Sequence, residues 1–221
     1  YDSLGRLIRE SDPDGVTTLH EYDARSRRTK TAIDMNANNA IDLGGPDRVT
    51  AMAYSVTTAN STVVNRTVTS LCAGNGTSAT VVSTVDQSVD GRSQWQTTFG
   101  QTTSTIATTP ASGGNWTVTT TNPDGTSTVQ DFENTRPVLV TQKASGGASV
   151  TSMAMTYDPH GRLLTQTDAR TGTTTLAYDN ADQVTSETAP DPTGGSSPLV
   201  TAYGYDSMGR RTRVAFPDCS V

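Results

Sequence analysis

The stretch Tyr157-Asp158-Pro159-His160-Gly161-Arg162-Leu163-Leu164 carries a pattern that returns at both ends of the chain. The pattern is a Tyr-Asp pair, two free positions, a Gly-Arg pair and then an apolar residue, and we call it the Tyr-Asp signature. Its other clear copies are Tyr1-Asp2-Ser3-Leu4-Gly5-Arg6-Leu7-Ile8 and Tyr205-Asp206-Ser207-Met208-Gly209-Arg210-Arg211, the last with Arg211 in the apolar place. This recurrence indicates a structural repeat rather than a catalytic motif.

The signature has the chemistry of a tight turn between two strands. Asp at the first position of a four-residue turn, Pro at the second and Gly at the fourth are preferred in type I turns, and Asp158, Pro159 and Gly161 occupy these places. The glycine adopts a positive φ that lets the next strand leave with the correct twist. Further tight turns are predicted at Asp2 to Gly5, Asp12 to Gly15, Asn122 to Gly125 and Asp206 to Gly209.

Each unit of the repeat contains a second turn and ends where the signature returns. Asp12 follows Tyr1 by eleven positions, as Asp168 follows Tyr157, and the Tyr-Asp pair returns ten positions later, giving a period of 21 residues. Such a unit is two short strands and two turns, a hairpin meander. Ser26 and Cys219 stand where a turn glycine is expected, which predicts a less regular turn at each.

At this period, Tyr-Asp-x-x-Gly-Arg-Leu closely resembles the YD repeats of RHS and YD-repeat proteins. The clear motifs cover residues 1–33 and 151–221. The resemblance implies an antiparallel β-sheet wound as a spiral shell, in large bacterial toxins or cell-surface proteins. It therefore implies an all-β fold, a secreted or cell-surface location and a structural role, but no reaction.

The composition fits a single curved sheet better than a compact two-layer domain. Only 33% of the 221 residues are hydrophobic and 5% are aromatic, which is little for a thick core, and 17% are charged.

The net charge of −6 argues against nucleic acid as a partner. No apolar run approaches the length that spans a bilayer, and no signal peptide precedes Tyr1, which lies within a repeat. The sequence therefore reads as a piece of a longer protein.

Four segments follow from these patterns. Residues 1–33 and 151–221 carry the clear repeats, residues 34–47 form an inserted loop rich in Asp and Asn, and residues 48–150 continue as a degenerate meander. No helix of useful length is predicted, because Pro, Gly and β-branched residues interrupt every candidate. The strand-like runs of the middle segment are Thr62 to Leu71, Ala79 to Val85, Ser93 to Ile106, Trp116 to Thr121 and Val138 to Lys143.

The inserted loop is a candidate calcium site. Asp34, Asn36, Asn38 and Asp42 occupy positions 1, 3, 5 and 9, and the carbonyl of Ala40 at position 7 is the candidate backbone ligand. This spacing resembles the D-x-N-x-D-G-x-x-D loops of calcium-binding repeats, and calcium takes six to eight oxygens. The alternative is a polar, Asn-rich turn that holds no ion. In that comparison Asn39 replaces the turn glycine, Gly45 stands where an EF-hand supplies a bidentate Glu, and Asp47 is a candidate substitute for that Glu.

Two aromatic residues keep a binding function open. Trp95, Thr97 and Phe99 alternate along one face of a predicted strand, and Trp116 begins a similar alternation. Packing in the sheet explains both tryptophans, and stacking on a sugar is the alternative. Cys72 and Cys219 form no C-x-x-C pair, and we interpret them as two free thiols.

The leading functional hypothesis is a non-enzymatic structural segment whose end strands pair with neighbouring repeat segments or with further copies of the chain. A carbohydrate-binding or adhesion module is the second hypothesis. An enzyme is the third, and the sequence gives it little support. His20 and His160 are the only histidines, and the chain contains no G-x-S-x-G elbow, H-E-x-x-H helix or Walker loop.

Overall fold

The computed structural model describes residues 1–72, 79–108, 114–192, 194 and 197–217, in two compact units, Tyr1–Ile106 and Ala107–Val221. Each unit is considered by itself. Cys219, with its predicted turn and any pairing with Cys72, lies outside the described residues. Within them, Cys72 is a buried free thiol.

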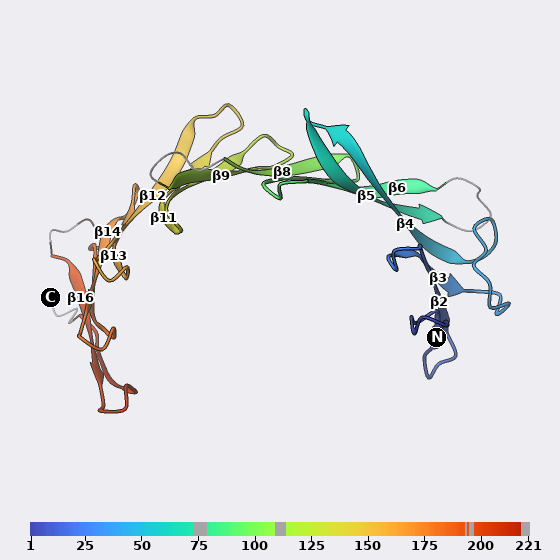
Figure 1. Ribbon diagram of the computed structural model, residues 1–221. Coiled ribbons are helices and arrows are strands. Elements are labelled where there is room, and N and C mark those ends of the chain that lie inside the picture. Colours follow the sequence, from blue (N-terminus) through green and yellow to red (C-terminus); the bar gives the residue numbers. More distant parts are fainter. Residues whose placement is uncertain (73–78, 109–113, 193, 195–196, 218–221) are drawn as a thin grey trace. The chain divides into compact units, whose positions relative to one another are not determined.

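The first unit is a sheet of consecutive antiparallel hairpins (Figure 1). Each strand from β1 to β7 pairs with the next in sequence, ending with the pair β7–β8. The hairpin of β4 and β5 is the longest, with paired residues running from Val49 and Cys72 to Ala59 and Thr62. The strands are β1 (Arg9–Ser11), β2 (Thr17–Tyr22), β3 (Arg28–Asp34), β4 (Arg48–Ala59), β5 (Thr62–Cys72), β6 (Thr80–Ser88), β7 (Ser93–Thr98) and β8 (Gln101–Ala107).

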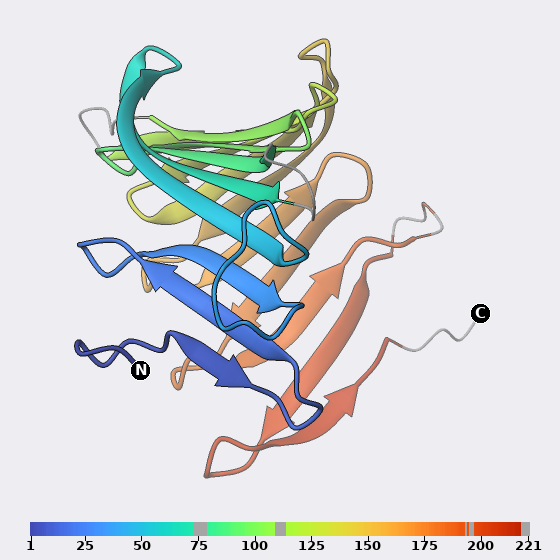
Figure 2. The same ribbon diagram turned by 90° about the vertical axis from the view of Figure 1, so that its right-hand side faces the viewer.

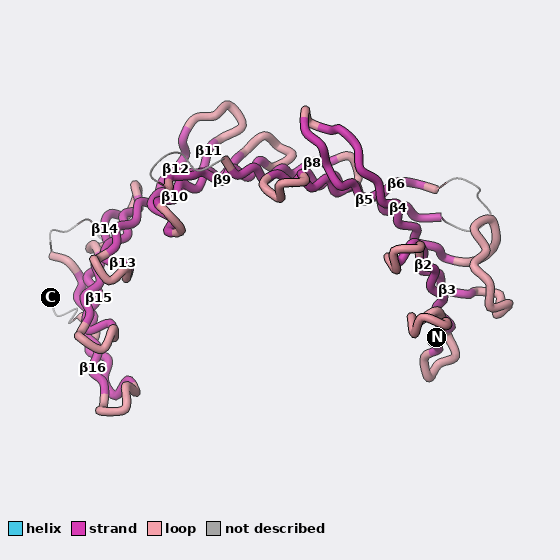
Figure 3. Tube along the Cα trace, viewed as in Figure 1, coloured by secondary structure: helices cyan, strands magenta, loops and turns pink. Residues whose placement is uncertain are grey.

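The second unit repeats this arrangement from β9 to β17, again with sequential antiparallel pairing. The strands are β9 (Asn115–Thr121), β10 (Ser127–Glu133), β11 (Arg136–Lys143), β12 (Ser149–Tyr157), β13 (Leu163–Asp168), β14 (Gly172–Tyr178), β15 (Val184–Ala189), β16 (Leu199–Tyr205) and β17 (Arg211–Ala215). Figure 3 shows only strands and loops in the described part of the chain, where no helix is long and apolar enough to cross a membrane. The predicted all-β antiparallel meander is confirmed.

The core is thin, as the composition predicts. The buried hydrophobic cluster consists of Ala32, Val49 and Cys72, with Ile41 packed against it. Most other apolar side chains are half-buried, because a strand in a single sheet has no second layer to cover its faces. Cohesion therefore depends heavily on the backbone ladder and on contacts between neighbouring hairpins.

Most predicted turns and strands are present. The amide of Gly161 donates to the carbonyl of Asp158 at 2.8 Å, and Gly161 has φ +85°. The other four predicted turns have the same bond, at 3.0 to 3.1 Å, and a glycine at positive φ. Four of the five predicted runs fall on β5, β6, β9 and β11, within three residues at each end.

Two expectations are wrong. The turn at Ser26 is regular, because Ser26 itself adopts φ +61° and its amide donates to the carbonyl of Asp23 at 3.0 Å. The run from Ser93 to Ile106 is two strands, β7 and β8, since Phe99 and Gly100 both have positive φ and form a two-residue turn. Phe99 is consequently 77% exposed and does not continue the face of Trp95.

Candidate functional site

The Tyr-Asp signature folds into a hairpin turn whose carboxylate accepts three hydrogen bonds. Asp158 Oδ1 accepts from the backbone amides of His160 and Arg162, at 3.0 and 2.9 Å, and Oδ2 accepts from Arg162 Nε at 2.7 Å. The amide of Asp158 in turn donates to the carbonyl of Arg162 at 2.9 Å. The strand pairing shifts register between Thr156 and Tyr157, as expected for a type I turn followed by a left-handed glycine.

The same geometry recurs wherever the signature occurs. Asp2, Asp23 and Asp206 each accept from two backbone amides of their turn and from the side chain of the arginine four residues later. Asp179 keeps the two amide bonds but is followed by Gln183 in place of the arginine. The turn thus tolerates loss of the ion pair but retains the bonds from the carboxylate to the backbone.

These donors keep the turn carboxylates ionised. At Asp2 and Asp23 the pKa lies below its usual value, chiefly because the backbone amide of the following arginine donates to the carboxylate. The pKa of Asp206 is lowered by the same leading cause. At Asp158, burial is the largest single influence and raises the pKa, but the hydrogen bonds from the side chain and backbone of Arg162 outweigh it.

Two of these arginines, Arg162 and Arg6, also reach the next hairpin. Arg162 donates through an Nη atom to the carbonyl of Asp179 at 3.2 Å and to the carboxylate of Asp182 at 2.7 Å. Its guanidinium lies 4.5 Å from the ring centre of Tyr178. In the first unit Arg6 makes the matching contacts with the Asp23 carbonyl and the Tyr22 ring, at 3.2 and 4.9 Å.

The signature tyrosines point in the opposite direction along the chain. Tyr178 donates its hydroxyl hydrogen to the carbonyl of Leu163 at 2.8 Å, and Tyr22 does the same to Leu7. Tyr157 and Tyr205 bind the carbonyls of Pro137 and Val184, at 2.8 and 2.9 Å. Each signature tyrosine after Tyr1 is therefore tied to a hairpin that precedes it.

The arginine and tyrosine contacts together form what we call the inter-hairpin clamp. The clamp uses the guanidinium and phenol groups of the signature to fix neighbouring hairpins at one spacing. This explains why Arg6 precedes Tyr22 by the same number of residues as Arg162 precedes Tyr178. The sequence predicted the turns but not the clamp. The constant spacing between each of these arginines and the next signature tyrosine was the signal in the sequence that could have predicted the clamp.

The inserted loop lies between β3 and β4, shown in blue in Figure 2. The structure brings Asn36, Asn38 and Asp42 together, with both amide nitrogens donating to Asp42 Oδ2, at 2.9 and 2.7 Å. Asp34 ends β3, is only 8% exposed and accepts from the amide of Asn39 through Oδ2 at 2.8 Å. The amide of Ala40 donates to Asn38 Oδ1.

Asp47, the candidate substitute for the position 12 Glu, is buried against the backbone of the loop. It is 1% exposed, and its two oxygens accept from the backbone amides of Met35 and Asp42, at 3.0 and 2.9 Å. It therefore ties both arms of the loop together. Across the described residues, no group of three or more His, Cys, Asp or Glu side chains is arranged to hold a metal ion.

The aromatic candidates differ from each other. Trp116 stacks on Phe132 with ring centres 4.2 Å apart and planes 12° apart, and its Nε1 donates to the carbonyl of Asn134. A hollow of about 500 Å³ beside this pair is also lined by Asp131 and Glu133. Trp95 is half-buried within β7. The sequence did not reveal Phe132 as the partner of Trp116.

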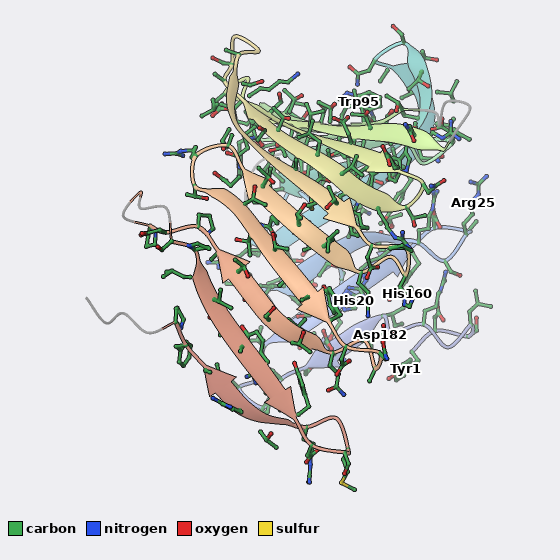
Figure 4. All side chains as sticks on the ribbon, turned by 90° about the vertical axis from the view of Figure 1, so that its left-hand side faces the viewer. Tyr1, His20, Arg25, Trp95, His160 and Asp182 are labelled. Atoms are coloured by element: carbon green, nitrogen blue, oxygen red, sulfur yellow. The ribbon has the colours of Figure 1, made fainter. Side chains whose placement is uncertain are left out.

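Both histidines contact residues of neighbouring strands or turns. The side chain of His20 is 3% exposed, with Nε2 3.6 Å from Glu10 and Nδ1 3.3 Å from the Thr31 hydroxyl. His160 is exposed on its turn, with Nδ1 3.9 Å from Asp182. Both residues are labelled in Figure 4. Asp182 is itself bound by Arg162, so this contact belongs to the inter-hairpin clamp.

Comparison with known proteins gives a family match over two regions that contain the signature copies beginning at Tyr1 and Tyr157. Two similar solved structures are the crystal structure of TcdB2-TccC3-TEV and the Photorhabdus luminescens Tc holotoxin pore, each 13% identical to this chain, with TM-scores of 0.36 and 0.38. In each case 98% of this chain is covered and 15% of the other chain. No curated protein sequence matches. The RHS repeat family model matches residues 1–34 and 157–193, so these two regions of the chain are similar to RHS repeats.

Proposed function

We propose that the chain is a non-catalytic wall segment, part of the β-sheet shell or surface assembly of a large secreted or cell-surface bacterial protein. The observation that carries the proposal is the inter-hairpin clamp. The arginines, aspartates and tyrosines that would be first suspected of chemistry are used to hold one hairpin against the next. Side chains that hold hairpins together in this way serve to extend a sheet.

The end strands support this role. β17 pairs with β16, and β1 with β2, and no further strand in the described residues covers the outer side of either. Unpaired strand edges present amides and carbonyls that another segment can continue. Neighbouring repeat segments of the same protein, or a second copy of this chain, are the partners that these edges fit.

The experiment is sedimentation velocity over a range of concentrations, with a charge placed at the edge. Val214→Lys in β17 introduces a lysine into an edge strand, which discourages edge pairing. Val200→Lys in β16 is the matched control, because β16 is paired on both sides. We expect the unaltered chain and the control to self-associate with concentration, and Val214→Lys to stay monomeric.

A chain that remains monomeric at every concentration would contradict the proposed use of its edges. Equal self-association of all three proteins would show that contacts elsewhere on the surface hold the copies together. Circular dichroism on each variant establishes that the β-sheet is retained.

Carbohydrate binding is a second candidate, favoured by one observation. The hollow beside Trp116 and Phe132 combines an aromatic wall with the carboxylates of Asp131 and Glu133, the pairing of apolar face and acceptor that sugars require. A glycan array tests it, with Glu133→Gln as the informative variant, because Glu133 is exposed. Binding that is lost in Glu133→Gln and kept in Trp95→Ala would support this site, and no signal from the unaltered chain would refute it.

A further inference from the structure

The inserted loop contains a buried carboxylate oxygen without a partner. Asp34 Oδ1 is buried and makes no hydrogen bond, although Oδ2 of the same carboxylate binds the amide of Asn39 within the loop. An ionised carboxylate taken out of water requires a compensating charge or hydrogen bonds. The other two acidic residues of the loop network, Asp42 and Asp47, are also carboxylates and cannot provide a positive charge.

We propose that this loop binds a calcium ion through Asp34, Asn36, Asn38 and Asp42, with the carbonyl of Ala40 as the backbone ligand. Calcium is a hard cation that takes side-chain amide and backbone carbonyl oxygens as readily as carboxylates. That preference explains why a set with few acidic groups qualifies, although no three of its side chains are His, Cys, Asp or Glu in a metal-binding arrangement. The ion supplies the positive charge that Asp34 Oδ1 lacks.

The other members of the set already surround one carboxylate. Asn36 and Asn38 both direct their amide nitrogens at Asp42 Oδ2. A half-turn of a side-chain amide exchanges its nitrogen for its oxygen, so an ion beside Asp42 can be met by oxygen ligands from the same two residues. Without an ion their oxygens accept from the amides of Asn38 and Ala40, and the half-turn exchanges these two bonds for contact with the ion.

Asp47 and Gly45 are positioning residues for this site. Asp47 binds the amides of Met35 and Asp42, which holds the first and last ligand positions near one another. A Cβ added at Gly45 would lie 2.7 Å from the Cβ of Asp42, so any larger residue must displace a ligand. The loop is therefore held in shape around Asp42 before an ion binds.

Calorimetry on the whole 221-residue chain tests the proposal, with calcium chloride as the titrant and magnesium chloride in parallel. Two carboxylates predict weak binding, with a Kd of about 0.1 to 1 mM. We expect Asp34→Asn to weaken binding at least about tenfold, since it removes a charged ligand. Asp14→Asn, in an exposed turn of the same unit, removes one negative charge outside the loop and should bind as the unaltered chain does. Magnesium should bind more weakly, because it demands a smaller and more regular cage.

Thermal unfolding gives a second readout that does not depend on heats of binding. In chelator, Asp34→Asn should melt at the same temperature as the unaltered chain or higher, because it removes an unpaired buried charge. In millimolar calcium the order should reverse, as only the unaltered chain is stabilised by the ion. Asp42→Asn repeats the test at a half-buried position should Asp34→Asn fail to fold.

The outcomes separate clearly. Heat and a thermal shift in the unaltered chain and in Asp14→Asn, both reduced in Asp34→Asn, establish the site. No heat and no shift at millimolar calcium would overturn the proposal, as would binding that is unchanged in both Asp34→Asn and Asp42→Asn. The self-association of the chain is measured separately, so failure here leaves the proposed structural role standing.

Discussion

The hairpin closed by Asp158 to Gly161 and the hairpin closed by Asn60 and Ser61 reverse the chain by different means. The first joins β12 to β13, strands of nine and six residues, and carries the carboxylate, arginine and tyrosine contacts of the signature. The second joins β4 and β5, strands of twelve and eleven residues, through two residues at positive φ, 50° and 60°. Such two-residue turns match the twist of the strands that they connect.

The difference shows what the signature is for. A long hairpin such as β4–β5 has enough ladder hydrogen bonds to hold its own register, and its turn needs only a compatible backbone. Short hairpins in a single layer have few such bonds and a thin core, so side-chain contacts to neighbouring hairpins supply the rest. The four predictions below separate these two ways of holding a hairpin.

Acid should have the largest effect, because it acts on all signature turns at once. The carboxyl pKa of Asp2, Asp23, Asp158 and Asp206 is lowered in the folded chain from the usual 3.8, so the unfolded chain takes up protons first. Stability from these groups is present above about pH 4 and is lost as the pH falls through the folded values. We expect the melting temperature to hold between about pH 7 and 5 and then to fall.

Hydrogen exchange measured over the same pH range distinguishes the two kinds of turn. Protection of the His160 amide, which binds Asp158, should fall with acid before that of amides in the β4–β5 hairpin. Simultaneous loss at both places would mean that the signature turns have no special dependence on their carboxylates.

Gly161→Val should be the most damaging single substitution. The residue has φ +85°, and its added Cβ would also meet the guanidinium of Arg136, which lies over the ring of Tyr157. We expect a loss of about 1 to 3 kcal/mol in the free energy of unfolding from backbone strain, measured by denaturant melts. Gly5→Val is the control, since Gly5 has φ +75° with nothing within 4 Å, and it should cost less. Equal costs would show that displacing Arg136 is immaterial.

Tyr178→Phe removes one link between hairpins and leaves the ring in place. Loss of the hydroxyl bond to the Leu163 carbonyl should cost about 1 kcal/mol in denaturant melts. Tyr1→Phe provides the comparison, because Tyr1 is 82% exposed and has no earlier hairpin to bind within this chain. A Tyr178→Phe protein as stable as Tyr1→Phe would remove the tyrosine from the clamp.

Ser26→Gly should stabilise the chain slightly. Ser26 has φ +61°, and relief of that strain, less the added freedom of glycine in the unfolded chain, predicts a gain of about 0.5 to 1 kcal/mol. Asp182→Gly sharpens the result, because Asp182 has φ +63° but binds Arg162 through a carboxylate at 2.7 Å, whereas Ser26 accepts from Arg6 at 3.4 Å. It should give no comparable gain. A destabilising Ser26→Gly would assign the serine a role beyond filling the turn.

The turns and the fold class were determined by the sequence itself. Aspartate, proline and glycine act on the backbone within four residues, so Asp158 to Gly161 and its copies were predictable without knowledge of any distant contact. The alternating, Thr-rich runs between them likewise predicted strands, and tight turns between short strands predicted antiparallel pairing.

Only the tertiary structure decided which hairpins the signature residues join and which residues of the inserted loop are buried. Ser26 keeps a regular turn because Asp23 and Arg27 hold it, which outweighs the preference of one residue for another conformation. The reach of Arg162 to Asp179, and the burial of Asp34 and Asp47 beneath their loop, depend on strand register and on where the chain returns. Those contacts join residues many positions apart, and local backbone preference extends over only a few.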